Sequence, residues 1–233
     1  MSLLTVVQYF CGRNAIPVPS SVVGTTDKGV LQVLRLLEEE GNDLAKRGNW
    51  NALTREATHT TLAAEDQGAI DSIATIFYRN IVNDTIWDRS GKLPVYPISE
   101  QEWQAIKGTI TSATPYRYRL RTNKLIVTPT PPAGLTWAFE YMSAAWILNG
   151  STPKQYFVAD TDTMLLPEDL LMQGLRWRYL REKGLEYAEL FATYEKQVIY
   201  ALAHEKPRTV LNASLHSNRK PGVLIPAGTW SIP

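Results

Sequence analysis

The sequence predicts an α+β protein. In it, a helical bundle built from the N- and C-terminal segments carries an inserted antiparallel β-rich domain and an extended C-terminal tail. Three observations predict this class. Apolar residues recur at helical spacing towards both ends, short alternating segments fill the middle, and the last stretch is rich in Pro, Gly and Asn. The expected units are residues 1–49 (first part of the bundle), 50–150 (β-rich insertion), 151–205 (second part of the bundle) and 206–233 (extended docking tail).

The N-terminal unit is expected to hold two helices. Ser2 can cap a short helix that runs through about Phe10 and is stopped by Gly12. After a Pro-containing loop, Thr26 or Asp27 can cap a second helix. The apolar residues of this second helix keep helical spacing: Val30, Leu31, Leu34, Leu37 and Leu44.

Two features inside the second helix carry expectations of their own. The run Glu38-Glu39-Glu40 is more typical of a solvated helix face than of a functional site. The pair Gly41-Asn42 marks a point at which the helix can kink or break before Lys46.

From Trp50 the apolar period changes to that of strands. The Thr-rich segment 54–62 is expected to be extended, whereas 70–78 allows either a strand or a short helix. Residues 86–87 resemble a strand end, and 88–91 resemble a turn.

The second half of the middle segment gives clearer signals. Ser99 and Glu102 form a capping box that opens a short helix through about Lys107. A hairpin is expected over 116–128, and a further alternating strand over 135–142. Antiparallel pairing suits such a series of short strands.

Two helices are expected near the C-terminal end. Pro167 suits the first helical position, and the helix should run to about Lys183. Gly184 interrupts it, and a second helix follows until Pro207. The apolar stripe expected to face a neighbour on this second helix is Leu185, Ala188, Phe191, Tyr194, Val198 and Ala201.

Composition excludes some functional classes. Of 233 residues, 44% are hydrophobic, and 24 Lys+Arg balance 23 Asp+Glu. This balance gives no support to wholesale binding of nucleic acid or a membrane surface, and it leaves local basic patches open. Cys11 is a lone cysteine in an apolar setting, which indicates a buried helix end and a reducing place of folding. Without a signal peptide or an apolar run of ~18 residues, the chain is expected to fold in a cytoplasm, with no membrane partner.

The search for chemistry finds no catalytic set, and no cofactor is expected. His59, His204 and His216 have no second ligand at metal spacing. The cluster Asp160-Thr161-Asp162 could bind a hard cation, but turn residues before a helix explain it better. Phosphate-binding loops and the nucleophile elbow are also absent from the sequence.

Two arginine clusters are candidates for an interface or for contact with DNA phosphates. Arg117, Arg119 and Arg121 alternate along one strand and should share a face. The second cluster lies on the helix that contains Trp177 and consists of Arg176, Arg178 and Arg181. A solvated face is the competing interpretation of both.

The C-terminal segment 206–233 cannot build a core of its own, yet it carries apolar side chains. Such spacing along an extended chain suits a segment that lies in a groove on a partner, and a frayed terminus is the alternative. The residues expected to bind a partner are Leu211, Leu215, Val223, Leu224, Ile225, Trp230 and Ile232.

Several segments carry a resemblance to a known family. They are Trp50-Asn51-Ala52-Leu53-Thr54-Arg55-Glu56-Ala57, Ala69-Ile70-Asp71-Ser72-Ile73, Ile86-Trp87-Asp88, Leu165-Leu166-Pro167-Glu168-Asp169-Leu170-Leu171 and Trp177-Arg178-Tyr179-Leu180-Arg181-Glu182-Lys183-Gly184. Over about residues 1–205 the chain resembles the head-to-tail adaptor, or connector, proteins of tailed bacteriophages, among them the tail tubular protein A of short-tailed phages.

The resemblance implies a structural virion protein. Proteins of this family form a ring, typically twelve-fold, at the capsid–tail junction between the portal and the tail nozzle or tube. The lumen passes double-stranded DNA without reading its sequence, and C-terminal segments commonly extend to the portal. The implied partners are therefore further copies of the chain, the portal protein, the nozzle or tube protein and the passing genome.

Two other classes of function remain open. The β-rich segment with Trp87, Trp103, Trp137 and Trp146 would suit a carbohydrate- or ligand-binding module, although core tryptophans are the commoner case. A tail-associated hydrolase would need paired carboxylates in a cleft, for which Glu56, Glu65 and Asp66 are poor candidates.

Overall fold

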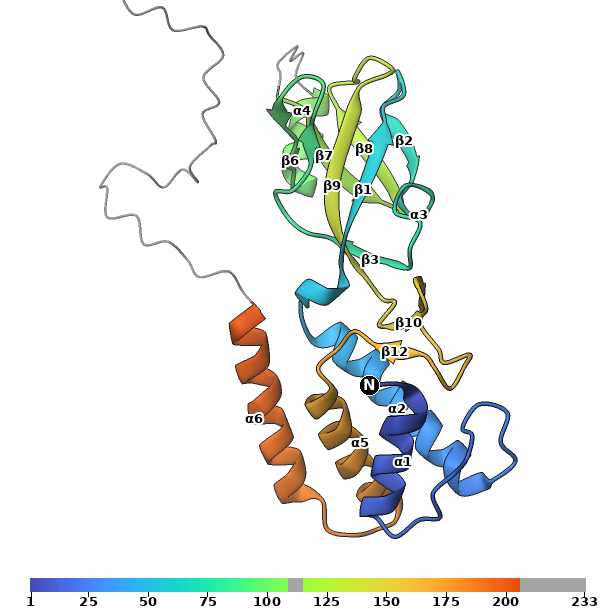
Figure 1. The fold of residues 1–233 in the computed structure, drawn as a ribbon. Coiled ribbons are helices and arrows are strands. Elements are labelled where there is room, and N and C mark those ends of the chain that lie inside the picture. The colour runs from blue at the N-terminus through green and yellow to red at the C-terminus, as the bar shows by residue number, and fades with distance from the viewer. Residues whose placement is uncertain (109–114, 206–233) are drawn as a thin grey trace, which may run out of the picture.

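A computed structural model describes residues 1–108 and 115–205, and these form a mixed α+β structure with several antiparallel sheets. Helices α1, α2, α5 and α6 lie at one end of an elongated molecule, and the strands up to β9 lie at the other (Figure 1). The helices are α1 (Leu3–Arg13), α2 (Lys28–Arg47), α3 (Ile70–Ile73), α4 (Glu100–Gly108), α5 (Glu168–Glu182) and α6 (Ala188–Glu205), with a 3₁₀ turn η1 (Asn51–Leu53).

The strands are short. They are β1 (Thr54–Thr60), β2 (Asp66–Ala69), β3 (Tyr78–Ile81), β4 (Trp87–Asp88), β5 (Leu93–Pro94), β6 (Tyr96–Pro97), β7 (Arg117–Arg121), β8 (Lys124–Thr128), β9 (Thr136–Ser143), β10 (Ile147–Asn149), β11 (Thr152–Lys154) and β12 (Thr163–Met164).

The predicted helix caps are confirmed, and the predicted ends shift by a few residues. The Ser2 side chain accepts a hydrogen bond from the Thr5 N–H, and Asp27 accepts one from the Gly29 N–H. Gly12 does not stop α1, which continues to Arg13. The Ser99–Glu102 capping box also forms, because each side chain accepts from the other residue's backbone N–H.

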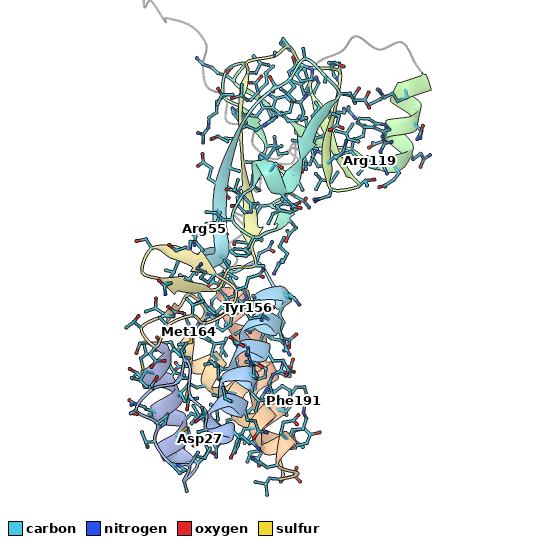
Figure 2. The ribbon with its side chains drawn as sticks, turned by 90° about the vertical axis from the view of Figure 1, so that its right-hand side faces the viewer. Asp27, Arg55, Arg119, Tyr156, Met164 and Phe191 are labelled. Carbon is cyan, nitrogen blue, oxygen red and sulfur yellow. The ribbon has the colours of Figure 1, made fainter. Side chains whose placement is uncertain are left out.

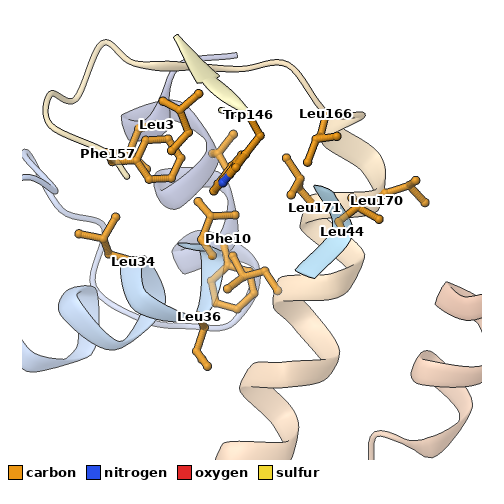
Figure 3. Packing of buried hydrophobic residues seen from close by; sticks show 14 of the residues in the cluster. Leu3, Phe10, Leu34, Leu36, Leu44, Trp146, Phe157, Leu166, Leu170 and Leu171 are labelled. Atoms are coloured by element: carbon orange, nitrogen blue, oxygen red, sulfur yellow. The ribbon is translucent and has the colours of Figure 1, made fainter. Parts of the chain in front are cut away.

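A core of buried aliphatic and aromatic side chains joins the helices (Figure 3). Trp146, which follows β9, inserts into this core with no exposed surface and donates a 3.0 Å hydrogen bond to Asn42. A Cβ atom added at Gly41 would lie 2.2 Å from the Trp146 ring. The pair Gly41-Asn42 therefore admits a tryptophan to the surface of α2, and α2 runs through it without a break.

Two sheets at the other end enclose a second core. One sheet has the order β1-β9-β4-β5, with β3 also paired to β9, and the other has the order β2-β8-β7-β6. Alternate residues of β8 face opposite ways. Val127 joins the core between the sheets, while Ile126 packs with Trp103 of α4. The predicted hairpin is confirmed, with Thr122 and Asn123 both at positive φ in the turn.

Two parts of the β structure differ from expectation. β6 pairs with β7 in parallel, against the antiparallel pattern of the other strand pairs described. Residues 147–164, for which the sequence predicts no strand, form a small sheet of order β11-β10-β12. Strands of two or three residues carry too little alternation to be recognised from sequence.

The ambiguous segment 70–78 contains both alternatives. Ile70–Ile73 forms the short helix α3, and the strand β3 begins at Tyr78. Within the described ranges, no helix combines the length and the apolar character that a membrane span requires.

Candidate interaction surfaces

Helix α6 is the least covered of the long helices. It contributes only Tyr194 and Val198 as fully buried residues. On the opposite side of the helix, Ile199 is 66% exposed and Tyr200 is 68% exposed. We define the α6 outer face by exposed residues that are apolar apart from one lysine: Ala188, Ala192, Lys196, Ile199, Tyr200 and Ala203.

The predicted apolar stripe of this helix is therefore correct only in part. Tyr194 and Val198 are buried, and Ala201 packs partly against the core. Leu185 precedes the helix and is 55% exposed, while Phe191 is 37% exposed and stacks edge-on against Trp177 at 5.0 Å. The second apolar face, around Ile199 and Tyr200, was missed. Plotting all apolar residues at 100° per residue could have revealed it.

A buried ionic cluster fixes α6 and α5 on α2. Arg178 of α5 donates from Nε to Glu40 Oε2 at 2.5 Å and from Nη2 to Asp43 Oδ2 at 2.9 Å, and it also pairs with Glu39. The Tyr194 hydroxyl of α6 donates to the other oxygen of Glu40. One carboxylate on α2 therefore binds side chains from both neighbouring helices.

Two expectations about this region are wrong. Glu38 and Glu40 are not on a solvated face, since they are 5% and 0% exposed, and only Glu39 of the run is open to solvent. Arg178 does not face a partner or DNA, because it is buried and its guanidinium is engaged by carboxylates of its own chain. A helical wheel cannot distinguish a buried, ion-paired charged residue from a solvent-exposed one, because both are polar in the sequence.

Burial sets the protonation behaviour of the cluster. It raises the pKa of the Glu40 carboxyl, and the hydrogen bonds from Arg178 and Tyr194 oppose that rise. Burial also raises the pKa of the Tyr194 hydroxyl, and the neighbouring Glu40 charge adds to the rise. The tyrosine therefore stays protonated and keeps its role as a donor.

The other arginines are placed differently. On β7, Arg117 and Arg119 are half-buried, and Arg121 is exposed. Arg119 lies 3.2 Å from Glu100 of α4, whose helix covers the same face of the sheet. Figure 2 shows Arg119 beside α4, at the end of the molecule distant from the long helices.

The remaining arginines lie on α5. Arg176 is half-buried, while Arg181 is exposed, pairs with Glu182 at 3.2 Å and lies over the Trp177 ring. Arg121 and Arg181 are thus the two arginines of the predicted set with open side chains.

A groove lies where the two ends of the molecule meet. It has a volume of about 670 Å³, and Val82, Met142 and Leu202 are among the apolar side chains that line it. At its rim the Asn51 N–H donates to the Glu205 carboxylate at 2.8 Å, and the Asn51 amide donates to the Glu205 carbonyl at 3.1 Å. The last described residue is therefore anchored beside this groove.

The acidic turn before α5 is structural in this fold. Asp160 accepts hydrogen bonds from the N–H groups of Val22 and Val23, and Asp162 accepts from Val158 and Ala159. The turn explanation of these residues is thereby confirmed. Among the described residues, no group of three or more His, Cys, Asp or Glu side chains is placed to hold a metal ion.

Most residues that suggested a carbohydrate-binding module or a hydrolase are either buried in a core or engaged in ion pairs. Trp103, Trp137 and Trp146 are core residues with 3% exposure or less, and Trp87 is half-buried. Glu56 pairs with Arg89, Glu65 with Lys107 and Asp66 with Lys124. The predicted binding residues of the tail, from Leu211 to Ile232, lie outside the described residues.

No protein-family model matches the chain, and a search of curated proteins finds no significant match.

Proposed function

We propose that this chain is a structural subunit of a tailed-bacteriophage virion, a head-to-tail adaptor. In this proposal, copies of the chain form a ring, of twelve by analogy with the family it resembles, between the portal and the tail nozzle or tube. The ring is assembled in the host cytoplasm, and its lumen conducts DNA.

The observation that carries the proposal is the open apolar face of α6. Isoleucine and tyrosine side chains two-thirds exposed on a firmly held helix are typical of a surface that another protein covers. A ring subunit needs such surfaces on both flanks, because each copy contacts two neighbours through different patches.

A finer architecture belongs to the same proposal. The helices of segments 1–49 and 151–205 would act as one bundle, and residues 50–150 as a β-rich domain inserted into it. The arrangement in Figure 1 supports this division, since the helices share one core and the two larger sheets share another.

The tail segment extends the proposal to a partner. Residues 206–233 follow directly on Glu205, which is held at the junction groove. We assign portal or neighbour binding to the apolar residues of this segment. Repetition around a ring would make many weak contacts effectively intramolecular and strong.

DNA passage requires only sequence-independent contacts with phosphates. Arg121 and Arg181 keep this role open, because their side chains are exposed. We no longer assign DNA contact to Arg178, because its side chain is buried.

Electron microscopy tests the proposal. Particles of the phage that encodes the chain should show a ring of this protein between capsid and tail, and purified protein mixed with portal should form the same ring. Monomers alone in the presence of portal would refute it. A glycan array and a zymogram, both expected to be negative, address the carbohydrate-binding and hydrolase alternatives.

A further inference from the structure

We infer that neighbouring copies associate head to tail, with the α6 outer face of one copy packed on a loop platform at the opposite flank of the next. The loop platform consists of segments 14–27 and 155–162. This inference rests on the proposed ring and names the two surfaces that would build it.

The loop platform carries exposed apolar side chains at the helical end. Val18 is 58% exposed, Tyr156 is 57% exposed and Val158 is 52% exposed. Both loops project from the side of the helical end opposite to α6 (Figure 1). In Figure 2 that side faces the viewer, with Tyr156 in front. Each copy thus presents exposed apolar side chains on both flanks.

The platform is held rigidly. Asp160 in one loop accepts hydrogen bonds from Val22 and Val23 in the other, at 3.1 and 2.7 Å. Between the exposed Tyr156 and Val158, Phe157 points inward and packs edge-on against Trp146 at 5.3 Å. These contacts fix the backbone that carries the two exposed side chains, so binding costs little backbone freedom.

The α6 face is equally well fixed. The hydrogen bond between Tyr194 and Glu40 and the 2.5 Å ion pair between Arg47 and Glu195 tie the helix to α2. Binding would therefore bring together two preformed surfaces.

Charges around the two patches are complementary. Just before and within the first turn of α6, Glu186 and Glu189 are exposed and outnumber the exposed Lys183. On the other flank, Lys28 is exposed at the N-terminal end of α2 (Figure 1). Together with Arg13 at the end of α1, it outnumbers the exposed Asp27. Head-to-tail packing brings these opposite charges together at the rim, where they would guide register.

A two-fold contact between two α6 helices fits less well. Lys196 is exposed among the residues of the α6 outer face, so a symmetric contact would place two copies of this lysine near each other. Packing on the platform avoids that repulsion, because Lys196 then meets a different surface. A contact between unlike surfaces can close into a ring.

Crosslinking of mixed single-cysteine variants tests the inference. V158C and I199C are made in separate full-length chains and mixed, and a short bis-maleimide is added. The native Cys11 is fully buried and does not compete. Linked dimers are expected in the V158C and I199C mixture and not with either variant alone. L62C, at a position 51% exposed on the β end, replaces V158C in the control mixture and should give no link.

The outcomes separate this inference from the function it rests on. Absence of a V158C–I199C link overturns the inference, and a link in I199C alone would show the two-fold contact instead. Microscopy of the same unmodified protein with portal is read independently. Rings without the link would leave the proposed function standing and move the interface elsewhere, whereas absence of rings would count against the function itself.

Discussion

Glu40 is the residue on which the helical end depends most directly. Its carboxylate has no exposed surface and binds Arg178 of α5 and Tyr194 of α6. A buried charge of this kind is costly unless every partner is in place, and it specifies one arrangement of the helices. The sequence contains this information only as one glutamate in a run of three, so its burial could not be predicted.

Replacing the tyrosine tests the cluster. Y194F keeps the ring and removes the hydroxyl, which leaves Glu40 one donor short. The free energy of unfolding in urea should fall by about 1–3 kcal/mol. Y200F, at a position 68% exposed, is the matched control and should change stability by less than about 0.5 kcal/mol. Equal effects of the two variants would contradict the assigned role of the hydroxyl.

The raised pKa of Glu40 predicts a pH dependence. Because burial lifts this pKa above its ordinary value of 4.5, the folded state binds the proton more tightly than the unfolded chain does. The contribution of Glu40 is therefore fully present below pH 4.5 and is lost as the pH rises through the folded-state pKa. The stability of the wild type minus that of E40Q should decrease over this interval in urea titrations.

E189Q, at an exposed position of α6, controls for the substitution itself. A difference between wild type and E40Q that increases with pH would show that the hydrogen bonds outweigh burial.

At the scale of elements, close packing between α5 and α2, and not helix propensity, explains the residue at position 174. Gly174 of α5 lies against Glu40 of α2, and a Cβ atom there would be 2.1 Å from the carboxylate carbon. Glycine weakens a helix interior by about 1 kcal/mol relative to alanine, so its presence here reflects the approach of the two helices.

Alanine at this position should therefore destabilise. G174A forces α5 away from α2 and disturbs the Glu40 cluster, with an expected loss of about 1–3 kcal/mol. G12A is the matched control, since a Cβ at Gly12 in α1 meets nothing within 4 Å, and it should gain up to about 1 kcal/mol. Thermal or urea unfolding distinguishes the two signs, and a stabilised G174A would refute the packing argument.

Elements with strong local signals were predictable, and those defined by distant partners were not. The caps at Ser2 and Asp27 and the hairpin turn at Thr122-Asn123 depend on neighbouring residues, and all are found. The parallel β6–β7 pair and the β10 sheet depend on residues far along the chain. The outer face of α6 was missed because its other apolar stripe satisfied the expectation of one buried face.

At the scale of the whole molecule, Arg79 links the two ends. From β3 it donates to the carbonyls of Ala45 and Gly48 at the C-terminal end of α2 and to Asn49. These carbonyls would otherwise lack partners at the helix end. One side chain of the β end therefore caps a helix of the other end.

Removal of this side chain should loosen the junction. R79A is expected to raise amide hydrogen exchange over residues 44–54 and to cost about 1–3 kcal/mol, the loss typical of hydrogen bonds to a charged group. R89A, which breaks an ion pair between two half-exposed side chains on the β end, is the control. Unchanged protection of residues 44–54 in R79A would show that other contacts hold the junction.

Removal of the C-terminal segment tests its assignment as a docking tail. A chain that ends at Glu205 should keep the circular dichroism of a folded protein, because residues 1–205 supply the two large cores described above. Its attachment to portal should weaken. Global unfolding of the truncated chain would contradict the assignment, and undiminished portal binding would transfer the contact to residues 1–205.

The junction also determines how force passes through the molecule. The chain crosses between the ends twice, before β1 and after β9, and the crossings run side by side because Thr54 pairs with Met142. Tension along the long axis is therefore divided between two backbones. Bending at the junction would have to slide β1 along β9. The antiparallel pairing of these two strands, which extends to the pair Thr60 and Thr136, opposes that movement. The two paired backbone segments of the junction can therefore transmit both compression and twisting from one end of the molecule to the other.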